Sequence, residues 1–211
     1  MPFFRQSVPP YILKHLLEKE AQRLRAHLGF GSDEPIGALE VAEMLGLKVV
    51  SPAALRYLSP GALRFLLGAA ARDWSGLACH LPNGIVAVVL NPTHSERRRR
   101  ATLMEEVGHL HLGHRPSAVT VDAPTGLMRR TYDKRQEDEA YWFGGAMLVP
   151  KTGLRALLGA GWSLRAAADF YGVSDDLVTF RANLHGLRRQ VQVSPGRGAP
   201  GPSLRAGGSD Q

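Results

Sequence analysis

Two carboxylates and a histidine lie close together in the stretch Glu105-Glu106-Val107-Gly108-His109. If this stretch is helical, Glu105 and His109 are four residues apart, so their side chains share one helix face and lie within about 6 Å of each other. That is the spacing that two ligands of one metal ion require. With histidine at position 105 the stretch would read H-E-x-x-H, in which two histidines hold zinc and the intervening glutamate acts as a general base on water.

The same five residues also suit an ordinary surface helix with a solvated acidic face and one histidine. Spacing alone therefore leaves both interpretations open. Cysteine chemistry is easier to exclude, because Cys79 is the only cysteine of the chain. It can form no internal disulfide and no cysteine-rich zinc module, and the neighbouring His80 should point to the opposite face of a strand. We therefore expect no cysteine nucleophile.

The residues around this stretch predict the elements that must position it. Apolar residues recur at helical intervals from about residue 95 to 113, which places Glu105, Glu106 and His109 on one amphipathic helix. Before it, residues 76–80 and 85–90 are apolar runs on either side of an Asn-Gly step, which is a strong hairpin signal. We expect a β-hairpin followed directly by the helix that carries the chemistry.

Upstream, the apolar spacing predicts helices over residues 10–28 and 36–45 and a short strand over residues 47–50. Residues 53–72 suit either a helix or a buried strand and stay open. Downstream, residues 164–184 are typical of a helix-turn-helix, with a glycine at the turn and a serine as the next helix cap. We favour packing over DNA recognition for this helical pair.

The chain of 211 residues carries a formal net charge of +7, which permits an acidic partner without requiring one. Positive charge gathers in Arg97–Arg100 and again around Arg181, Arg188 and Arg189. Such runs usually form a solvated face, so contact with nucleic acid is not favoured. The first ten residues contain no apolar stretch of signal-peptide length, and no apolar run approaches the length of a membrane span. We expect a cytoplasmic protein without membrane association.

Two longer stretches resemble the ImmA/IrrE family of metallopeptidases. The first family pattern, R-x-T-L-x-H-E-L-G-H-x-x-x-G-H, is matched at Thr102, Leu103, Glu106, Gly108, His109, Gly113 and His114. The second pattern, E-x-x-A-N-x-F-A-A-x-L-L-x-P, is matched at Glu137, Ala140, Phe143, Ala146, Leu148 and Pro150. With the N-terminal helix and the strand entry at Leu45-Gly46-Leu47, the resemblance extends over about residues 10–187.

The resemblance implies a small α+β, gluzincin-like metallopeptidase domain. Its expected parts are a β-hairpin or small sheet, an active-site helix and a C-terminal helical pair. We expect this domain to span residues 1–192. Residues 193–211 are rich in proline and glycine, which predicts a disordered tail.

The resemblance also implies a metal-dependent endopeptidase that cleaves a regulatory, repressor-like protein. Glu105, His109 and Glu137 would be the metal ligands, and Glu106 would be the general base. The implied ion is Zn²⁺, with Mn²⁺ or another divalent cation as the alternative. Glu139 also lies nearby, but it is two residues from Glu137 and so nearly on the opposite helix face, and the motif spacing favours Glu137.

The sequence departs from the family patterns at two positions of the expected site. Glu105 replaces the first ligand histidine, and Tyr141 replaces an Asn or Asp that would orient His109 through its second ring nitrogen. Two carboxylate ligands in place of one favour harder ions such as Mn²⁺ more than the usual site does. The alternative function is a catalytically weak or inactive relative that acts as a repressor- or DNA-binding regulatory module.

Two further histidines follow the expected ligand. His111 should be turned away from His109, and we interpret it as a surface or packing residue. His114 comes just after Gly113, at the end of the predicted helix. In its charged form it would interact favourably with the helix dipole, so we expect a capping role there.

Overall fold

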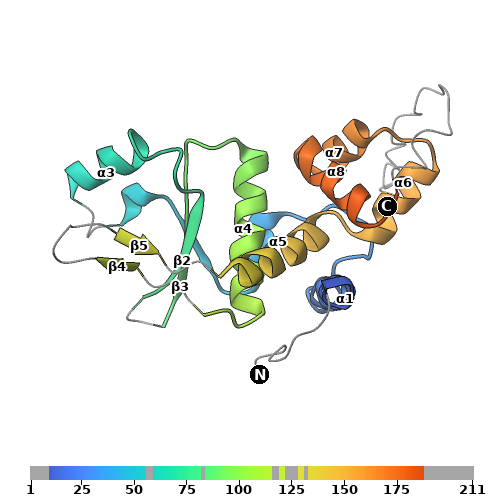
Figure 1. Ribbon diagram of the computed structural model, residues 1–211, viewed down its shortest axis with the longest axis horizontal. Helices are drawn as coiled ribbons and strands as arrows, with labels where there is room; N and C mark the ends of the chain where they lie inside the picture. Colours follow the sequence, from blue (N-terminus) through green and yellow to red (C-terminus); the bar gives the residue numbers. More distant parts are fainter. Residues whose placement is uncertain are drawn as a thin grey trace, which may run out of the picture.

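The structure is a computed structural model that describes residues 10–55, 59–81, 84–115, 119–121, 128–130 and 133–187. Both helices and strands are present, and they confirm the predicted α+β class. Figure 1 shows two crossing helices at the centre, with the sheet on one side and the C-terminal helices on the other. The predicted tail over residues 193–211 and the domain end at residue 192 lie outside the described residues.

A small sheet forms the first side of the molecule. Strand β2 (Gly76–His80) pairs antiparallel with β3 (Val86–Leu90), which confirms the predicted hairpin. Strand β1 (Lys48–Val50) pairs parallel with the other edge of β3, so the order is β1-β3-β2. Residues on the central strand β3 are almost entirely buried, because β1 and β2 flank it and α4 packs on it. Strands β4 (Val119–Val121) and β5 (Met128–Arg130) form a separate antiparallel pair.

The central helices are α4 (Glu96–His111) and α5 (Lys134–Leu148). Helix α4 begins where the Ser95 side chain accepts a hydrogen bond from the backbone nitrogen of Arg98, which is a serine N-cap. One face of α4 packs on the sheet and another on α5. The core between the two helices consists of buried apolar side chains at helical spacing: Leu103, Met104 and Val107 from α4, and Phe143 and Met147 from α5.

The N-terminal elements largely follow the sequence prediction. Helix α1 (Pro10–His27) buries Leu13, Leu17, Ala21 and Leu24 and packs against α5. The short helix α2 (Ala38–Met44) precedes β1 and packs against α4. Residues 53–72, for which the sequence left helix or strand undecided, follow a 3-10 turn that begins at Pro52 (Pro52–Ala54) and contain helix α3 (Pro60–Leu67). Helix α3 has no buried residue.

The C-terminal side consists of α6 (Lys151–Gly159), α7 (Leu164–Tyr171) and α8 (Asp175–Leu184). The turn between α7 and α8 has Gly172 in the left-handed region, at φ +62°, and the Ser174 hydroxyl caps α8. This confirms the predicted helix-turn-helix geometry. None of the described helices combines the length and the apolar character that crossing a membrane requires.

Candidate metal centre

Three side chains from the two central helices converge at one point. Glu105 and His109 come from α4, and Glu137 comes from the first turn of α5. Each offers one ligand atom, and these atoms all lie within 4.8 Å of one another. The Nε2 atom of His109 lies 3.6 Å from Oε2 of Glu137, and both side chains are 22% exposed. The cluster is therefore half-buried, and part of it remains exposed to solvent.

Close contact between α4 and α5 brings these residues together. A Cβ built on Gly108 of α4 would lie 3.0 Å from the backbone oxygen of Ala140. A Cβ built on Gly144 of α5 would lie 3.0 Å from the backbone nitrogen of Glu105. Each helix thus presents a glycine where the other's backbone passes, and a larger residue would separate them.

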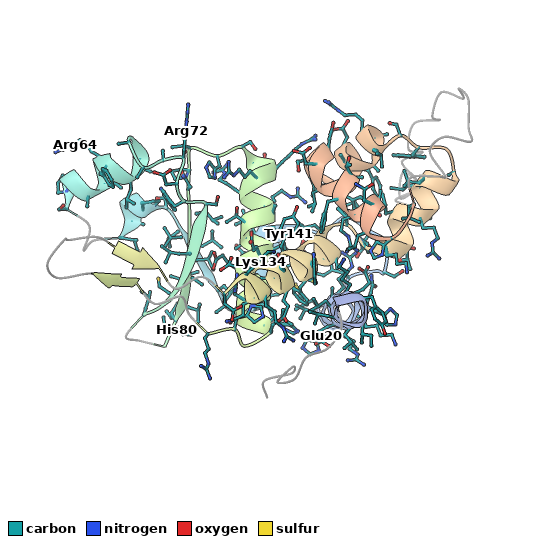
Figure 2. The ribbon with its side chains drawn as sticks, in the orientation of Figure 1. Glu20, Arg64, Arg72, His80, Lys134 and Tyr141 are labelled. Atoms are coloured by element: carbon teal, nitrogen blue, oxygen red, sulfur yellow. The ribbon has the colours of Figure 1, made fainter. Side chains whose placement is uncertain are left out.

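The N-cap of α5 fixes where Glu137 stands on its helix. The Asp133 side chain accepts hydrogen bonds from the backbone nitrogens of Arg135 and Gln136, at 3.0 and 3.3 Å. The backbone nitrogen of Glu137 then donates to the Asp133 carbonyl, which closes the first helical turn. Because this cap sets the first turn, it also sets the direction in which the Glu137 side chain leaves the helix. Lys134, labelled in Figure 2, pairs instead with Asp138 at 2.7 Å.

Glu106, the expected general base, lies on α4 directly after Glu105 and three residues before His109. Residues three apart on a helix are neighbours on its surface, so the Glu106 carboxylate stands on the flank of the cluster. Its side chain is half-buried.

His114 occupies a place that the sequence did not predict. Its Nδ1 atom lies 3.0 Å from Nδ1 of His109, and its Nε2 atom lies 3.1 Å from Oε2 of Glu139. The side chains of His114 and Glu139 are 6% and 8% exposed. Gly113 has φ +66° and ends the helix, and the backbone nitrogen of His114 donates to the His109 carbonyl at 3.0 Å, so His114 caps α4 through its backbone while its side chain turns toward the site. The match of His114 to the family pattern was the one sequence signal for this role.

Glu139 stands apart from the three-residue cluster. Besides His114 it contacts Arg135, whose Nε atom donates to its Oε1 atom at 2.7 Å. Burial opposes ionisation of this carboxyl group, but the hydrogen bonds from His114 and Arg135 outweigh that effect and lower its pKa. Glu139 is thus held as a carboxylate behind His114, whereas Glu137 lies with Glu105 and His109.

Two other residues singled out in the sequence have different surroundings. His111 stacks on Phe143 and lies 3.0 Å from Glu20, which Figure 2 labels on α1. This fits the expected packing role. Tyr141, also labelled in Figure 2, lies edge-on against Phe180 of α8. Burial, and then the charges of Glu105 and Asp176, raise the pKa of Tyr141, so its hydroxyl stays protonated.

Arginines at the start of α4 form hydrogen bonds with other parts of the same chain. Arg97 donates to the Val173 carbonyl at 2.9 Å and to Asp169 at 2.6 Å. Arg100 donates to the carbonyl oxygens of Ile36 and Tyr171. These contacts tie α4 to the turn between α7 and α8. The two guanidinium groups are therefore already engaged by protein oxygens, which supports packing over phosphate contact for this region.

The donor set fits a divalent cation. Metal–ligand bonds from imidazole nitrogen or carboxylate oxygen are about 2.0–2.2 Å long, so two ligands of one ion can stand 3.6 Å apart, as His109 and Glu137 do. One nitrogen and two carboxylate oxygens satisfy zinc, and the oxygen-rich set also suits harder ions. The residues present can thus hold a cation, although the set departs from the usual two histidines and one glutamate.

Comparison with known proteins places this chain in a family. The sequence pattern of the IrrE N-terminal-like domain, a peptidase family, matches residues 71–183 of the 211 in the chain. No curated protein matches the chain significantly. Among solved structures, a Mycobacterium tuberculosis transcriptional regulator is similar with a TM-score of 0.48 and 15% identity, over 87% of this chain and 54% of that one. The chain thus spans about half the length of that regulator. Because the family pattern covers more than half of the sequence, including both helices of the cluster, the chain belongs to the peptidase family of the IrrE N-terminal-like domain.

Proposed function

We propose that this chain is a metal-dependent endopeptidase in which Glu105, His109 and Glu137 hold a divalent cation and Glu106 is the general base. The observation that carries the proposal is the convergence of the three ligand atoms within 4.8 Å, on the two helices that the family pattern covers. The sequence motif needs only Glu105 and His109 on one helix. The arrival of Glu137 from a second helix supports a three-ligand site over a solvated acidic face.

The proposed roles of the cation and of Glu106 follow from their chemistry. A divalent cation at the cluster would act as a Lewis acid that polarises the scissile carbonyl and makes water more acidic. The Glu106 carboxylate would take a proton from the attacking water as the new carbon–oxygen bond forms. It would then deliver that proton to the leaving nitrogen as the carbon–nitrogen bond breaks. One carboxylate thus serves as base and then as acid, and it is regenerated.

The cation is proposed to be Zn²⁺, with Mn²⁺ as the principal alternative. Glu105, His109 and Glu137 bring two negative charges, whereas a site with two histidines brings one. The additional charge makes bound water less acidic and favours oxygen-preferring ions more than a two-histidine site does. We therefore expect weaker discrimination between Zn²⁺ and Mn²⁺ than in the two-histidine arrangement.

The substrate is proposed to be a regulatory protein, such as a transcriptional repressor, in the cytoplasm. The family supports a protein substrate, and the choice of a repressor rests on the resemblance described above. Nucleic acid is not favoured as a partner, because Arg97 and Arg100 already bind Asp169 and backbone oxygens. The acidic start of α8, at Asp175 and Asp176, would also repel phosphate from the helix that a helix-turn-helix uses for recognition.

The second candidate function is a catalytically weak relative that binds a repressor or DNA as a regulatory module. The specific observation in its favour is Glu105, which stands where the family pattern has a ligand histidine. The retained Glu106 favours the enzyme, because a module that only binds has no use for a base beside the cluster.

Metal content distinguishes the two candidates. Purified protein should retain about one divalent ion per chain after dialysis, and Glu105→Ala and Glu137→Ala should each lose it. The matched control is Asp138→Asn, which removes the carboxylate adjacent to Glu137 that pairs with Lys134. This control should retain the ion. A folded wild-type protein that takes up neither Zn²⁺ nor Mn²⁺ would contradict the peptidase proposal and favour the binding module.

A further inference from the structure

Helices α5 and α8 each carry a carboxylate and an aromatic ring one helical turn apart. On α5 the two residues are Glu137 and Tyr141, and on α8 they are Asp176 and Phe180. Side chains four residues apart lie on the same face of a helix. The rings of Tyr141 and Phe180 meet edge-on, with their centroids 4.9 Å apart. The two faces that carry the carboxylates are therefore joined by an aromatic pair.

The aromatic pair lies where α5 and α8 pack closely. A Cβ built on Gly145, one turn after Tyr141, would lie 3.4 Å from Cδ1 of Leu177 on α8. Tyr141, which Figure 2 labels on α5, nevertheless remains 37% exposed. Burial raises the pKa of Tyr141, and the charges of Glu105 and Asp176 raise it further, so both carboxylates lie near this ring. Tyr141 thus borders both the candidate metal centre and the start of α8.

The acidic residues around this ring differ in whether a positive charge balances them. Asp175 lies 3.4 Å from a guanidinium nitrogen of Arg165. Asp176 is exposed, and no lysine or arginine within the described ranges forms an ion pair with it. A divalent cation would balance the charges of Glu105 and Glu137. The carboxylate of Asp176 would then still lack a counter-charge.

Aromatic rings attract cations to their faces. The chain contains one such contact beside the aromatic pair, because Nζ of Lys14 lies 4.9 Å from the ring centroid of Trp142. In the part of the chain that the structure describes, no lysine or arginine lies over Tyr141 or Phe180 in this way. Two rings beside an unbalanced carboxylate suit a side chain with an apolar stem and a positive end. Arginine and lysine have both features.

We propose that Tyr141, Phe180 and Asp176 form a subsite for an arginine or lysine side chain of the protein substrate. Tyr141 lies about 6 Å along α5 from Glu137, which is the length of about two residues of extended peptide. The cationic residue would therefore lie within about two residues of the scissile bond. This placement rests on the proposed function, whereas recognition of the cationic side chain does not. The subsite also gives a role to tyrosine at a position where the family pattern has Asn or Asp.

Peptide binding to the metal-free chain tests recognition without catalysis. The probes are a capped Ala-Ala-Arg-Ala-Ala peptide and the same peptide with citrulline, whose neutral side chain has nearly the shape of arginine. In NMR titrations the arginine peptide should shift the ring signals of Tyr141 and Phe180. Its Kd should be about 10-fold lower than that of the citrulline peptide, because the positive charge contributes both a cation–π contact and an ion pair.

Two substitutions separate these contributions. Asp176→Asn should reduce the preference for arginine over citrulline about 2–5-fold, because the ion pair is lost. Tyr141→Leu keeps an apolar side chain without an aromatic face, and it should reduce the preference by a similar factor of about 2–5. The matched control is Asp175→Asn, which removes a carboxylate from the same first turn of α8. It should keep the wild-type preference, because Asp175 pairs with Arg165.

Cleavage by the metal-loaded chain provides the second readout. The arginine is moved stepwise along an otherwise neutral peptide, and the products are identified by mass spectrometry. The cut should follow the arginine and stay within about two residues of it. The ratio of kcat/KM for the arginine peptide to that for the citrulline peptide should exceed one. Asp176→Asn should lower this ratio by the same factor as the binding preference.

Equal affinity of the wild type for the two peptides would overturn the inference. An arginine preference that Asp176→Asn leaves unchanged would also overturn it, because the arginine would then bind at the three-residue cluster. If Tyr141→Leu does not fold, Asp176→Asn at its exposed position still decides the question. A chain that binds the arginine peptide at Tyr141 but takes up no metal would contradict the proposed function and support the subsite. Cleavage that ignores the position of arginine would support the proposed function and overturn the subsite.

Discussion

Gly144 of α5 faces the backbone of Glu105 so closely that a Cβ on Gly144 would stand 3.0 Å from the Glu105 nitrogen. The same Cβ would stand 2.9 Å from the carbonyl carbon and oxygen of Met104. Because the obstacle is backbone, a side chain at position 144 can be accommodated only if the helices move apart. Glycine has a hydrogen atom where every other residue has a Cβ. The close packing of α4 and α5, and with it the geometry of the candidate metal centre, therefore depends on glycine at position 144.

Gly144→Ala should destabilise the fold and weaken metal binding together. Overpacking costs about 1–3 kcal/mol, which exceeds the gain of about 1 kcal/mol from replacing glycine by alanine within a helix. Because α5 also carries Glu137, its displacement should lower cation affinity. Denaturant unfolding and metal titration measure the two effects.

Gly159→Ala is the matched control for this change. Gly159 ends α6, and a Cβ there would meet nothing within 4 Å. This variant should be as stable as wild type or slightly more stable, with unchanged metal affinity. If Gly144→Ala behaved in the same way, the close contact would have no energetic consequence.

Periodicity predicted most of the fold because most elements bury one regular face. Helices α1 and α4 have this property, whereas strand β3 is buried along almost its whole length and was predicted from its apolar run beside the Asn-Gly step. Helix α3 lacks this property: its residues are exposed or half-exposed, and Phe65 is 61% exposed. An apolar run that is not buried gives no reliable period, which is why residues 53–72 stayed ambiguous.

Only the part of the candidate site that lies on one helix could be predicted from residue spacing. Glu105 and His109 lie four residues apart on one helix, so the sequence places them together. Glu137 comes from another helix, and only the family resemblance suggested it. The side-chain direction of His114 depends on the left-handed turn at Gly113 and on a carboxylate 25 residues away, Glu139. Neither factor has a local signature.

The burial of two arginines could not be predicted from the sequence either. Arg181 was counted with a basic surface, yet it is 1% exposed and donates to Glu18 and to the Val149 carbonyl. Arg25 is fully buried and donates to the carbonyl oxygens of Gly31, Glu34 and Met147. Charged residues are rarely buried without partners, and these partners are distant in sequence or irregular backbone. The charge pattern therefore placed Arg181 on a solvated face.

Glu106→Gln tests the general base. The amide has nearly the same shape but cannot take a proton from water, so peptide hydrolysis should fall by roughly 10²–10⁴-fold. Fold and metal content should stay unchanged, because Glu106 is not one of the three proposed ligands. Substrate cleavage, thermal unfolding and metal analysis measure these properties. Cleavage at the wild-type rate would remove Glu106 from the mechanism.

Glu105→His tests the departure from the family pattern. The change provides a neutral nitrogen ligand four residues before His109 and removes one negative charge from the cluster. Zn²⁺ affinity should rise relative to Mn²⁺ affinity, because imidazole suits zinc better than it suits manganese. Competitive titration with the two ions measures the ratio. An unchanged ratio would show that residue 105 does not contribute a ligand.

A buried ion pair between the first and last described helices predicts how stability depends on pH. Nε2 of His185 and the guanidinium of Arg181 lie 3.4 and 2.6 Å from the Glu18 carboxylate. The backbone nitrogen of Lys151 also donates to it at 3.0 Å. Burial by itself raises the pKa of Glu18, but these contacts outweigh it and lower the pKa from 4.5 to about 2.

A carboxyl group with a lowered pKa stabilises the fold fully above its unfolded-state pKa and loses that effect as the pH falls toward the folded-state value. For Glu18 this window runs from about pH 4.5 down to about 2. At 1.36 kcal/mol per pKa unit the full contribution is about 3 kcal/mol, and the side chain is only 11% exposed, so solvent screens it little. Because Glu18 takes up a proton more readily in the unfolded chain, lowering the pH from 6 to 3 should cost the wild type about 2 kcal/mol of unfolding free energy.

Glu18→Gln removes this titration and leaves Arg181 buried without its counter-charge. The variant should be less stable by about 3–5 kcal/mol at pH 6, and its stability should fall less steeply from pH 6 to pH 3 than that of wild type. Glu43→Gln, at an exposed position of α2, should keep the wild-type slope. Urea unfolding at a series of pH values measures all three proteins. If the slopes of wild type and Glu18→Gln coincide, Glu18 is not the group that links α1 to α8 through its charge.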